Sequence, residues 1–327
     1  MKNVSKLALF VAAGMMTAGA QAASFDVDES TTLSIGGEVK IKANDTETAV
    51  GDSTFDTDGG AEFVIGAERA LGNGLSAYVE TVVEYDTLAE DEAKDELVNG
   101  QSVIGFTGNF GEIQIGESDN IFEDVITDAT DPFEEVGMPK ASDSSETDMF
   151  TYYSPDFGGF SYRLQTRIAD ESNTGTNSTE ISLIAAAEYD LGNVTLGAAY
   201  DDRGSKNAAE TGFQSEDPIY GVSAVIEISD ALEAGLKYAK ESNVSGNDSD
   251  FTALTLNYDY GAGNIYGGIG SESPDTGADV TKTAVGVDFG IADDFKVYAE
   301  YSNEDGALDS DDVSIDRIME VGFEFAY

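Results

Sequence analysis

The feature that most constrains the fold of this chain is an alternation of apolar and polar residues with a period of two. At the C-terminus, Phe323, Phe325 and Tyr327 alternate with small or charged residues, which is the side-chain period of a β-strand. No stretch after residue 22 has 18 or more consecutive apolar residues, so the sequence predicts no membrane-spanning helix there. The same alternation recurs over residues 160–164, 232–238, 254–260, 285–291 and 295–301. The chain is therefore predicted to be all-β.

The links between the predicted strands are of two alternating kinds. Seven are short and rich in tight-turn residues, and eight are longer, acidic and rich in Ser, Asn and Gly. The short links lie at 71–74, 108–111, 156–159, 190–193, 229–231, 261–263 and 290–293, and the long ones at about 43–60, 86–100, 118–148, 170–179, 201–217, 241–250, 272–279 and 303–313. This alternation requires sixteen strands. It predicts a 16-stranded antiparallel transmembrane β-barrel with short periplasmic turns, long extracellular loops and an aqueous channel.

A soluble β-sandwich would also show alternation, but it would bury an apolar inner face. The second face of these strands is charged instead, and it carries Glu38, Glu62, Glu80, Glu84, Arg163, Arg167, Glu188, Lys237, Lys282 and Glu324. We expect this face to contact water, which favours the barrel over the sandwich.

The first 22 residues differ in character from the rest of the chain. Lys2 and Lys6 precede an apolar run, which is followed by small residues that end at Ala22. This order is typical of a secretory signal peptide, and the apolar run is too short to span a bilayer. We therefore expect a signal peptide at 1–22 and a single barrel domain at 23–327, with an N-terminal anchor helix as the alternative.

The composition excludes several classes of function. The chain has no His and no Cys, so it lacks the residues behind most zinc sites, Ser-His triads and thiol nucleophiles. With 64 Asp and Glu against 16 Lys and Arg, the formal charge of −48 would repel a nucleic acid backbone. We expect no enzyme activity, no cofactor, no metal site and no nucleic acid partner. A secreted adhesin that binds calcium through its acidic tracts is the distant alternative.

Four segments, in order along the chain, resemble those of the general trimeric porins of Gram-negative bacterial outer membranes. They are residues 63–77, the turn and strand 108–116, the segment 152–160 that begins Tyr-Tyr-Ser-Pro, and the terminal aromatic residue. The resemblance runs through the whole chain after residue 22. It implies a homotrimer in the outer membrane, in contact with lipid and lipopolysaccharide. It also implies that the barrel-assembly machinery recognises the C-terminal strand through Phe323, Phe325 and Tyr327.

By the same resemblance, the third long loop, at about 118–148, would fold into the barrel and narrow the pore. This loop carries ten acidic residues and one basic residue. The candidate constriction residues are Glu123, Asp124, Asp128, Asp131, Glu134 and Glu135. A solvated surface loop is the alternative.

The opposite wall departs from the family pattern. The positions that match the family's ladder of basic side chains best are Glu38, Glu62, Glu117 and Tyr153, none of them basic. A displaced basic set could come from Lys40, Lys42, Arg163 and Arg167, which could equally pair with neighbouring carboxylates. The expected function is passive diffusion of small hydrophilic solutes and ions, with a preference for cations, and a substrate-selective channel is the closer alternative.

Overall fold

A computed structural model describes residues 23–48, 53–86, 97–141, 148–168, 183–202, 218–242, 248–306 and 315–327. The predicted signal peptide and parts of most of the long links lie outside these residues. Seventeen strands are described: β1 Ala23–Asp28, β2 Thr31–Thr48, β3 Ser53–Gly72, β4 Leu75–Asp86, β5 Val98–Gly108, β6 Gly111–Glu117, β7 Met149–Tyr153, β8 Phe160–Arg167, β9 Ile184–Asp190, β10 Val194–Asp201, β11 Ile219–Ser229, β12 Leu232–Glu241, β13 Ser249–Asp259, β14 Asn264–Pro274, β15 Val280–Ala292, β16 Phe295–Asp305 and β17 Ile315–Ala326. Among the described residues, no helix is long and apolar enough to cross a membrane.

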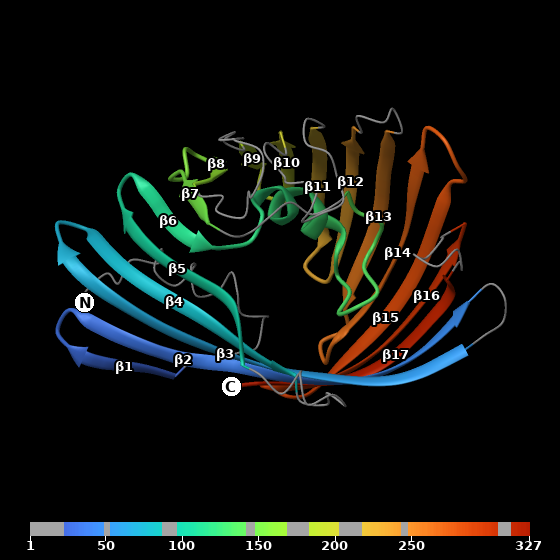
Figure 1. Cartoon of the computed structure of the whole chain (residues 1–327), viewed down its shortest axis with the longest axis horizontal. Coiled ribbons are helices and arrows are strands. Elements are labelled where there is room, and N and C mark those ends of the chain that lie inside the picture. The colour runs from blue at the N-terminus through green and yellow to red at the C-terminus, as the bar shows by residue number, and fades with distance from the viewer. Residues whose placement is uncertain are drawn as a thin grey trace, which may run out of the picture.

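Strands β2–β17 form a closed ring of sixteen antiparallel strands (Figure 1). Each strand pairs with its neighbour in the sequence, and the ring closes where β17 pairs with β2. Ala326 lies opposite Glu38, and Tyr327 exchanges two backbone hydrogen bonds with Gly37. The predicted barrel and its strand number are confirmed.

A short seventeenth strand, β1, was not predicted from the alternation. It pairs with residues 31–35 of β2, whereas β17 pairs with residues 38–48 of the same strand. β1 therefore occupies the part of the β2 edge that β17 does not reach. A tight turn makes this return possible, because the Asp28 carboxylate accepts a hydrogen bond from the Ser30 N–H at 2.8 Å.

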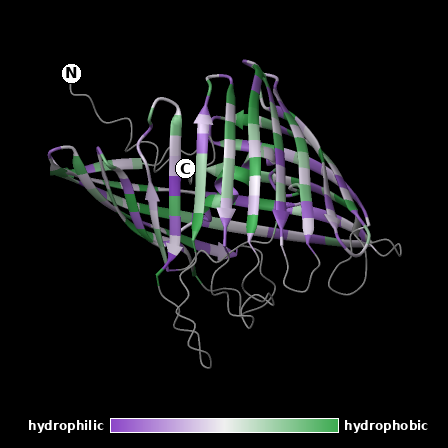
Figure 2. Cartoon of the chain, turned by 90° about the horizontal axis from the view of Figure 1, so that it is seen from above, coloured by the Kyte–Doolittle hydropathy of each residue, from purple (hydrophilic) through white to green (hydrophobic). Residues whose placement is uncertain are grey.

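The two faces of the strands differ as the alternation predicted. Apolar side chains such as Ile65 and Phe323 point outward and are about half exposed, whereas Glu320 and Glu324 face the interior of the ring. Figure 2 shows the strands side by side, with hydrophobic and hydrophilic residues alternating along them. An apolar exterior around a polar interior suits a barrel in lipid with a wet lumen.

The first long link differs from its prediction as a loop over 43–60. Strand β2 continues to Thr48 and β3 begins at Ser53, and the two stay paired as far as Glu47 and Ser53. The acidic residues of this segment alternate with Thr, Ala and Phe, and Thr and Phe favour strands. The barrel wall is therefore extended here by paired strands, because β2 also pairs with β17 as far as Thr48.

Candidate functional site

The third long link enters the ring, as predicted, instead of lying outside as a solvated surface loop. It contains a π-helical turn, η1 (Glu123–Thr127), followed by a 3₁₀ turn, η2 (Asp128–Thr130). These turns lie against the inner faces of β9–β13. Figure 1 shows them as the green coiled segments inside the ring. We call residues 118–141 the inner loop.

The inner loop packs on the wall through apolar side chains. Ile121 and Ile126 are fully buried, and they belong to a cluster with wall residues such as Ala199 and Ala239. Burying two such side chains contributes on the order of 4 kcal/mol of apolar transfer free energy. The loop is thus held as a packed part of the fold.

Glycines on the wall allow the loop backbone to approach closely. A Cβ atom on Gly235 of β12 would lie 1.8 Å from the carbonyl oxygen of Ala129, and one on Gly221 of β11 would lie 2.8 Å from a methyl carbon of Ile126. Side chains do not tolerate such distances, so these positions require glycine if the loop is to lie against the wall. Among the segments whose alternation predicted strands, 232–238 places Gly235 on the water-facing side, whereas Gly221 lies outside these segments.

Two buried polar side chains tie the loop to the wall. Near its start, Gln165 of β8 donates to the Asp119 carbonyl oxygen at 2.8 Å and accepts from the Ile121 N–H at 3.3 Å. Near its tip, Glu300 of β16 accepts hydrogen bonds from the three successive N–H groups of residues 134–136 at 2.7–3.1 Å. Sequence reasoning missed both side chains, because nothing local distinguishes them from other water-facing residues.

The tip of the loop is held by three lysines of the wall. Glu134 contacts Lys296 of β16 at 2.6 Å and Lys40 of β2 at 3.4 Å, and Glu135 contacts Lys42 of β2 at 2.6 Å. Burial alone would raise the pKa of Glu134, but Lys296 and Lys40 hold that pKa below its ordinary value. Lys40 and Lys42 are therefore engaged by the loop.

The basic residues of β8 are also engaged. Arg163 bridges the Asp124 carboxylate of the loop at 2.7 Å and the Glu188 carboxylate of β9 at 2.6 Å, and its guanidinium lies 5.8 Å from the centre of the Tyr153 ring. Arg167 lies four residues, or two strand repeats, further along the same face of β8 and also has interaction partners. Arg163 and Tyr153 therefore lie beside the part of the inner loop that contains η1.

The remaining loop carboxylates differ in their surroundings. Glu123 pairs with Lys140 at 3.0 Å within the loop, whereas Asp128 and Asp131 are exposed to the lumen. The surrounding barrel wall removes part of the bulk water around the lumen-facing Asp128 and raises its pKa to about 7, and the nearby carboxylates of Asp124 and Asp131 act in the same direction. Burial also raises the pKa of Asp124 to about 6, although Arg163 opposes this. These two groups titrate near neutral pH.

The wall formed by β2, β3 and β4 carries a row of carboxylates. Glu38 lies directly opposite Glu62, and Glu62 lies directly opposite Glu84. Directly opposed like charges destabilise a sheet, so a row of three is unfavourable for folding alone. In the described part of the chain, no ion pair includes Glu62 or Glu84. Glu117 lies opposite Ser102 at the end of β6 and is not part of this row.

We call Glu38, Glu62 and Glu84 the glutamate row. A recess of about 360 Å³ opens beside it. The tip of the inner loop reaches the same recess through Glu135. Its charged lining consists of Glu38, Glu62, Glu84, Asp58, Asp86, Glu135, Lys40 and Lys42. Carboxylates therefore outnumber lysines, and both lysines already contact a loop carboxylate.

The C-terminal strand presents its aromatic side chains to the exterior. Phe323 is 50% exposed and Phe325 is 41% exposed, and the Tyr327 ring packs on Phe325 and Phe63. This placement agrees with an outward-facing assembly signal, whose recognition by the assembly machinery stays a prediction.

Replacing Tyr327 with Asp should sharply reduce the amount of assembled barrel in the outer membrane. The change removes both ring contacts and places a charge on the lipid face. Heat-modifiable mobility on a denaturing gel measures the folded fraction, and Tyr327→Phe, which keeps the ring, is the control. A normal yield of folded Tyr327→Asp protein would contradict the assignment.

Comparison with known proteins agrees with this architecture. The family model of the Gram-negative porins matches residues 8–311. The chain is 30% identical over 285 residues to a protein of a Halomonas species named a monosaccharide porin, a match that covers 80% of this chain and 77% of that one. The major outer membrane protein of Halomonas elongata matches to the same extent.

Solved structures share the fold. The anion-selective porin from Comamonas acidovorans superposes with a TM-score of 0.76 and 16% identity, covering 91% of this chain and all of that one. In the described residues, no group of three or more acidic side chains is arranged to hold a metal ion. The closed sixteen-stranded ring, the inward third loop and the family match together identify the chain as a member of the Gram-negative porin family, a channel of the bacterial outer membrane.

Proposed function

We propose that this porin is a water-filled channel for passive diffusion of small hydrophilic solutes and ions, and that it prefers cations. The observation that carries the preference is the glutamate row. It faces the lumen beside a loop tip whose own charges are balanced by wall lysines. Because no ion pair of the described residues includes Glu62 or Glu84, a passing ion meets more negative charge than positive charge at this place.

The size of the effect follows from Coulomb's law. At an effective dielectric of about 20, one unpaired charge 5 Å from a permeant ion is worth on the order of 3 kcal/mol before screening. Salt reduces this, because the Debye length falls from about 8 Å at physiological ionic strength to about 3 Å at 1 M. The preference for cations should be strongest in dilute salt. Much of the overall acidity serves to solvate the protein rather than to tune the pore.

The zero-current potential across a planar bilayer in a KCl gradient tests the proposal. We expect a clear preference for K⁺ in dilute salt at pH 8, and a weaker preference in concentrated salt. An anion-selective wild-type channel in dilute salt would refute the proposal.

The same measurement should depend on pH. As the pH falls below about 7, Asp128 becomes protonated, and Asp124 follows below about 6, so negative charge leaves the loop. The preference for K⁺ should therefore decrease as the pH falls from 8 to 5.5. In Asp128→Asn, the part of this decrease that occurs near pH 7 should be absent. A preference that does not change between pH 8 and pH 5.5 would contradict the titration of these groups.

A sugar-selective channel is the second candidate, because one Halomonas relative is named a monosaccharide porin. The described lumen face offers few aromatic rings for sugars to stack on, and Tyr266 and Tyr298 are almost fully buried. These observations favour a general pore.

From the family, we infer a homotrimer embedded in lipid and lipopolysaccharide. The mass of the detergent-extracted protein, measured by light scattering, tests whether three chains associate.

A further inference from the structure

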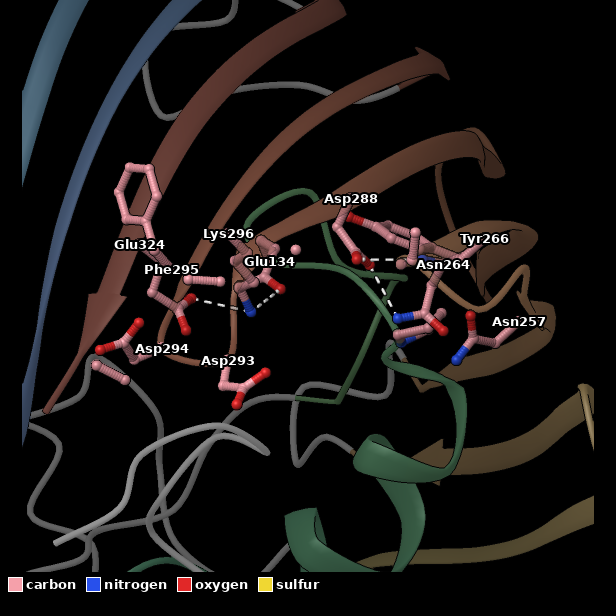
Figure 3. Close-up of a pocket in the computed structure, with 16 residues that line it drawn as sticks. Glu134, Asn257, Asn264, Tyr266, Asp288, Asp293, Asp294, Phe295, Lys296 and Glu324 are labelled. Atoms are coloured by element: carbon pink, nitrogen blue, oxygen red, sulfur yellow. Dashed lines mark hydrogen bonds and ion pairs between the residues drawn. The ribbon is translucent and has the colours of Figure 1, made fainter.

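One lysine of the barrel wall differs from the other lysines in the described part of the chain. Lys237 of β12 is on the lumen face of its strand, yet its exposed fraction is only 6%. Its ammonium nitrogen is buried and has no hydrogen-bond or ion-pair partner among the described residues. The other described lysines each contact a carboxylate: Lys40, Lys42, Lys140, Lys240, Lys282 and Lys296. Figure 3 shows the contrast at Lys296, whose ammonium is joined by dashed lines to Glu134 and Glu324.

The inner loop covers Lys237 from the lumen. Directly opposite Lys237 on the neighbouring strand, Ser223 of β11 donates a hydrogen bond to the Val125 carbonyl oxygen at 2.5 Å. Two residues along β12, Gly235 lies so close to the Ala129 carbonyl that a Cβ there would be 1.8 Å from its oxygen. The loop backbone therefore touches the wall at two positions next to Lys237, and the backbone between these contacts separates the ammonium from the lumen.

The same part of the loop presents carboxylates to the lumen. Asp128 and Asp131 lie at its end and are exposed. They are the acidic side chains whose negative charges act most strongly on the Lys237 ammonium. The barrel wall removes part of the bulk water around Asp131 and so raises its pKa, and the positive charge of Lys237 is the largest influence that opposes this rise. One positive charge and two negative charges therefore face each other across the loop backbone.

An unpaired ammonium beneath the loop has two physical consequences. Removing a charge from water without giving it a partner destabilises the folded state, so Lys237 is unfavourable for folding alone. Its field is not cancelled by a direct ion pair, so it reaches the lumen where the loop carboxylates meet passing ions. There the ammonium raises the energy of cations and lowers that of anions, whereas Asp128 and Asp131 do the opposite.

We propose that Lys237 is a specificity-determining residue of this channel. Its positive charge, held beneath the inner loop, offsets part of the negative charge of Asp128 and Asp131 and so limits the preference for cations at the constriction. The inference deepens the proposed cation preference and rests on it. It gives a side chain that does not contact the permeant ions a role in the choice between them.

The test measures the permeability ratio of K⁺ to Cl⁻, taken from the zero-current potential of the purified full-length porin in planar bilayers, in dilute KCl at pH 7.5. Lys237→Met keeps an unbranched apolar side chain and removes the charge. It should raise the ratio by roughly two- to threefold, because a unit charge about 10 Å from the ion path acts on K⁺ and Cl⁻ with opposite signs. Asp131→Asn should lower the ratio by a similar factor, and the double variant should return close to the wild-type ratio.

Lys240→Met is the matched control. Lys240 lies three residues further along β12 on the outer face, where it pairs with Asp248 at 3.4 Å. The control variant therefore makes the same change in net charge outside the lumen, and it should leave the ratio nearly unchanged.

Heat-modifiable mobility on a denaturing gel supplies a second readout. Lys237→Met should raise the temperature at which the barrel unfolds, because it removes a buried charge that has no partner. Lys240→Met breaks an exposed ion pair and should not raise this temperature.

Several outcomes would overturn the proposal. These are an unchanged or lowered ratio in folded Lys237→Met channels, an equal shift in Lys240→Met, and a double variant that does not return toward the wild-type ratio. Failure of Lys237→Met to fold would also contradict it, because methionine keeps the apolar part of the side chain and the lost ammonium has no partner.

The sign of the wild-type potential is read separately. A cation-preferring wild type whose ratio does not change in Lys237→Met refutes only the role of Lys237. An anion-preferring wild type whose ratio still rises in Lys237→Met refutes only the proposed selectivity.

Discussion

Replacing Glu62 and Glu84 together with arginine should turn the channel from a preference for K⁺ to a preference for Cl⁻. The two residues are direct cross-strand neighbours on β3 and β4, and both line the recess beside the loop tip. The change converts two negative charges into two positive ones at the same place in the lumen. Each charge at 5 Å from an ion is worth on the order of 3 kcal/mol before screening, so the sign of the local potential should reverse.

The measurement is the zero-current potential in a KCl gradient at low salt. Glu62→Gln with Glu84→Gln should give an intermediate value, because it removes the negative charge without adding positive charge. Glu29→Arg with Asp230→Arg makes the same change in net charge at two exposed turns and should leave the preference for K⁺ almost intact. If the turn variant shifts the potential as far as the lumen variant, net charge rather than the glutamate row sets the selectivity.

The barrel could be predicted from the sequence because each strand carries its own evidence. Alternation such as that of Phe323, Phe325 and Tyr327 fixes which face meets lipid, and the link lengths fix the number of strands and their order. These are local properties, and the hydrogen bonding of a closed ring leaves one arrangement compatible with them. The paired strands at 43–60 were missed because acidic, Thr-rich segments favour loops as readily as exposed ribbons.

The candidate site was predicted only in outline. The sequence placed Lys40, Lys42 and Arg163 on the water-facing side but left open whether they face the pore or pair with carboxylates. The ion pair between Lys40 and Glu134 joins residues 94 positions apart, and no local pattern specifies such a contact. The row Glu38–Glu62–Glu84 likewise depends on the register of three strands.

The anchors of the inner loop were not predictable for a related reason. In the sequence, Glu300 is one of several lumen-facing acids, and only the fold shows that it accepts three backbone N–H groups of the loop. Gly221 and Gly235 carry a weak signal in the sequence, since both occupy water-facing positions of neighbouring strands. Glycine at such positions indicates close approach of another backbone, although it does not identify which backbone.

Replacing Gly235 with valine should push the inner loop into the lumen and lower the single-channel conductance by at least about a factor of two, because the narrowest radius governs permeation. A Cβ at this position would lie 1.8 Å from the Ala129 carbonyl oxygen and 2.7 Å from Thr255 Oγ1. Strand β12 is paired along its whole length with β11 and β13, so the loop yields more easily than the wall. Gln165 and Glu300 hold the loop on either side of this point, so its middle should bow inward.

Gly60 provides the matched control for this change. It is also on a barrel strand, and a Cβ there would meet nothing within 4 Å. Gly60→Ala should therefore leave conductance nearly unchanged, whereas Gly235→Ala should lower it and Gly235→Val should lower it further. The folded fraction on a denaturing gel distinguishes a narrowed channel from a failure to assemble. If folded Gly235→Val channels conduct as well as the wild type or better, the loop either does not rest on this glycine or swings out of the pore, and the wall contact does not set the constriction.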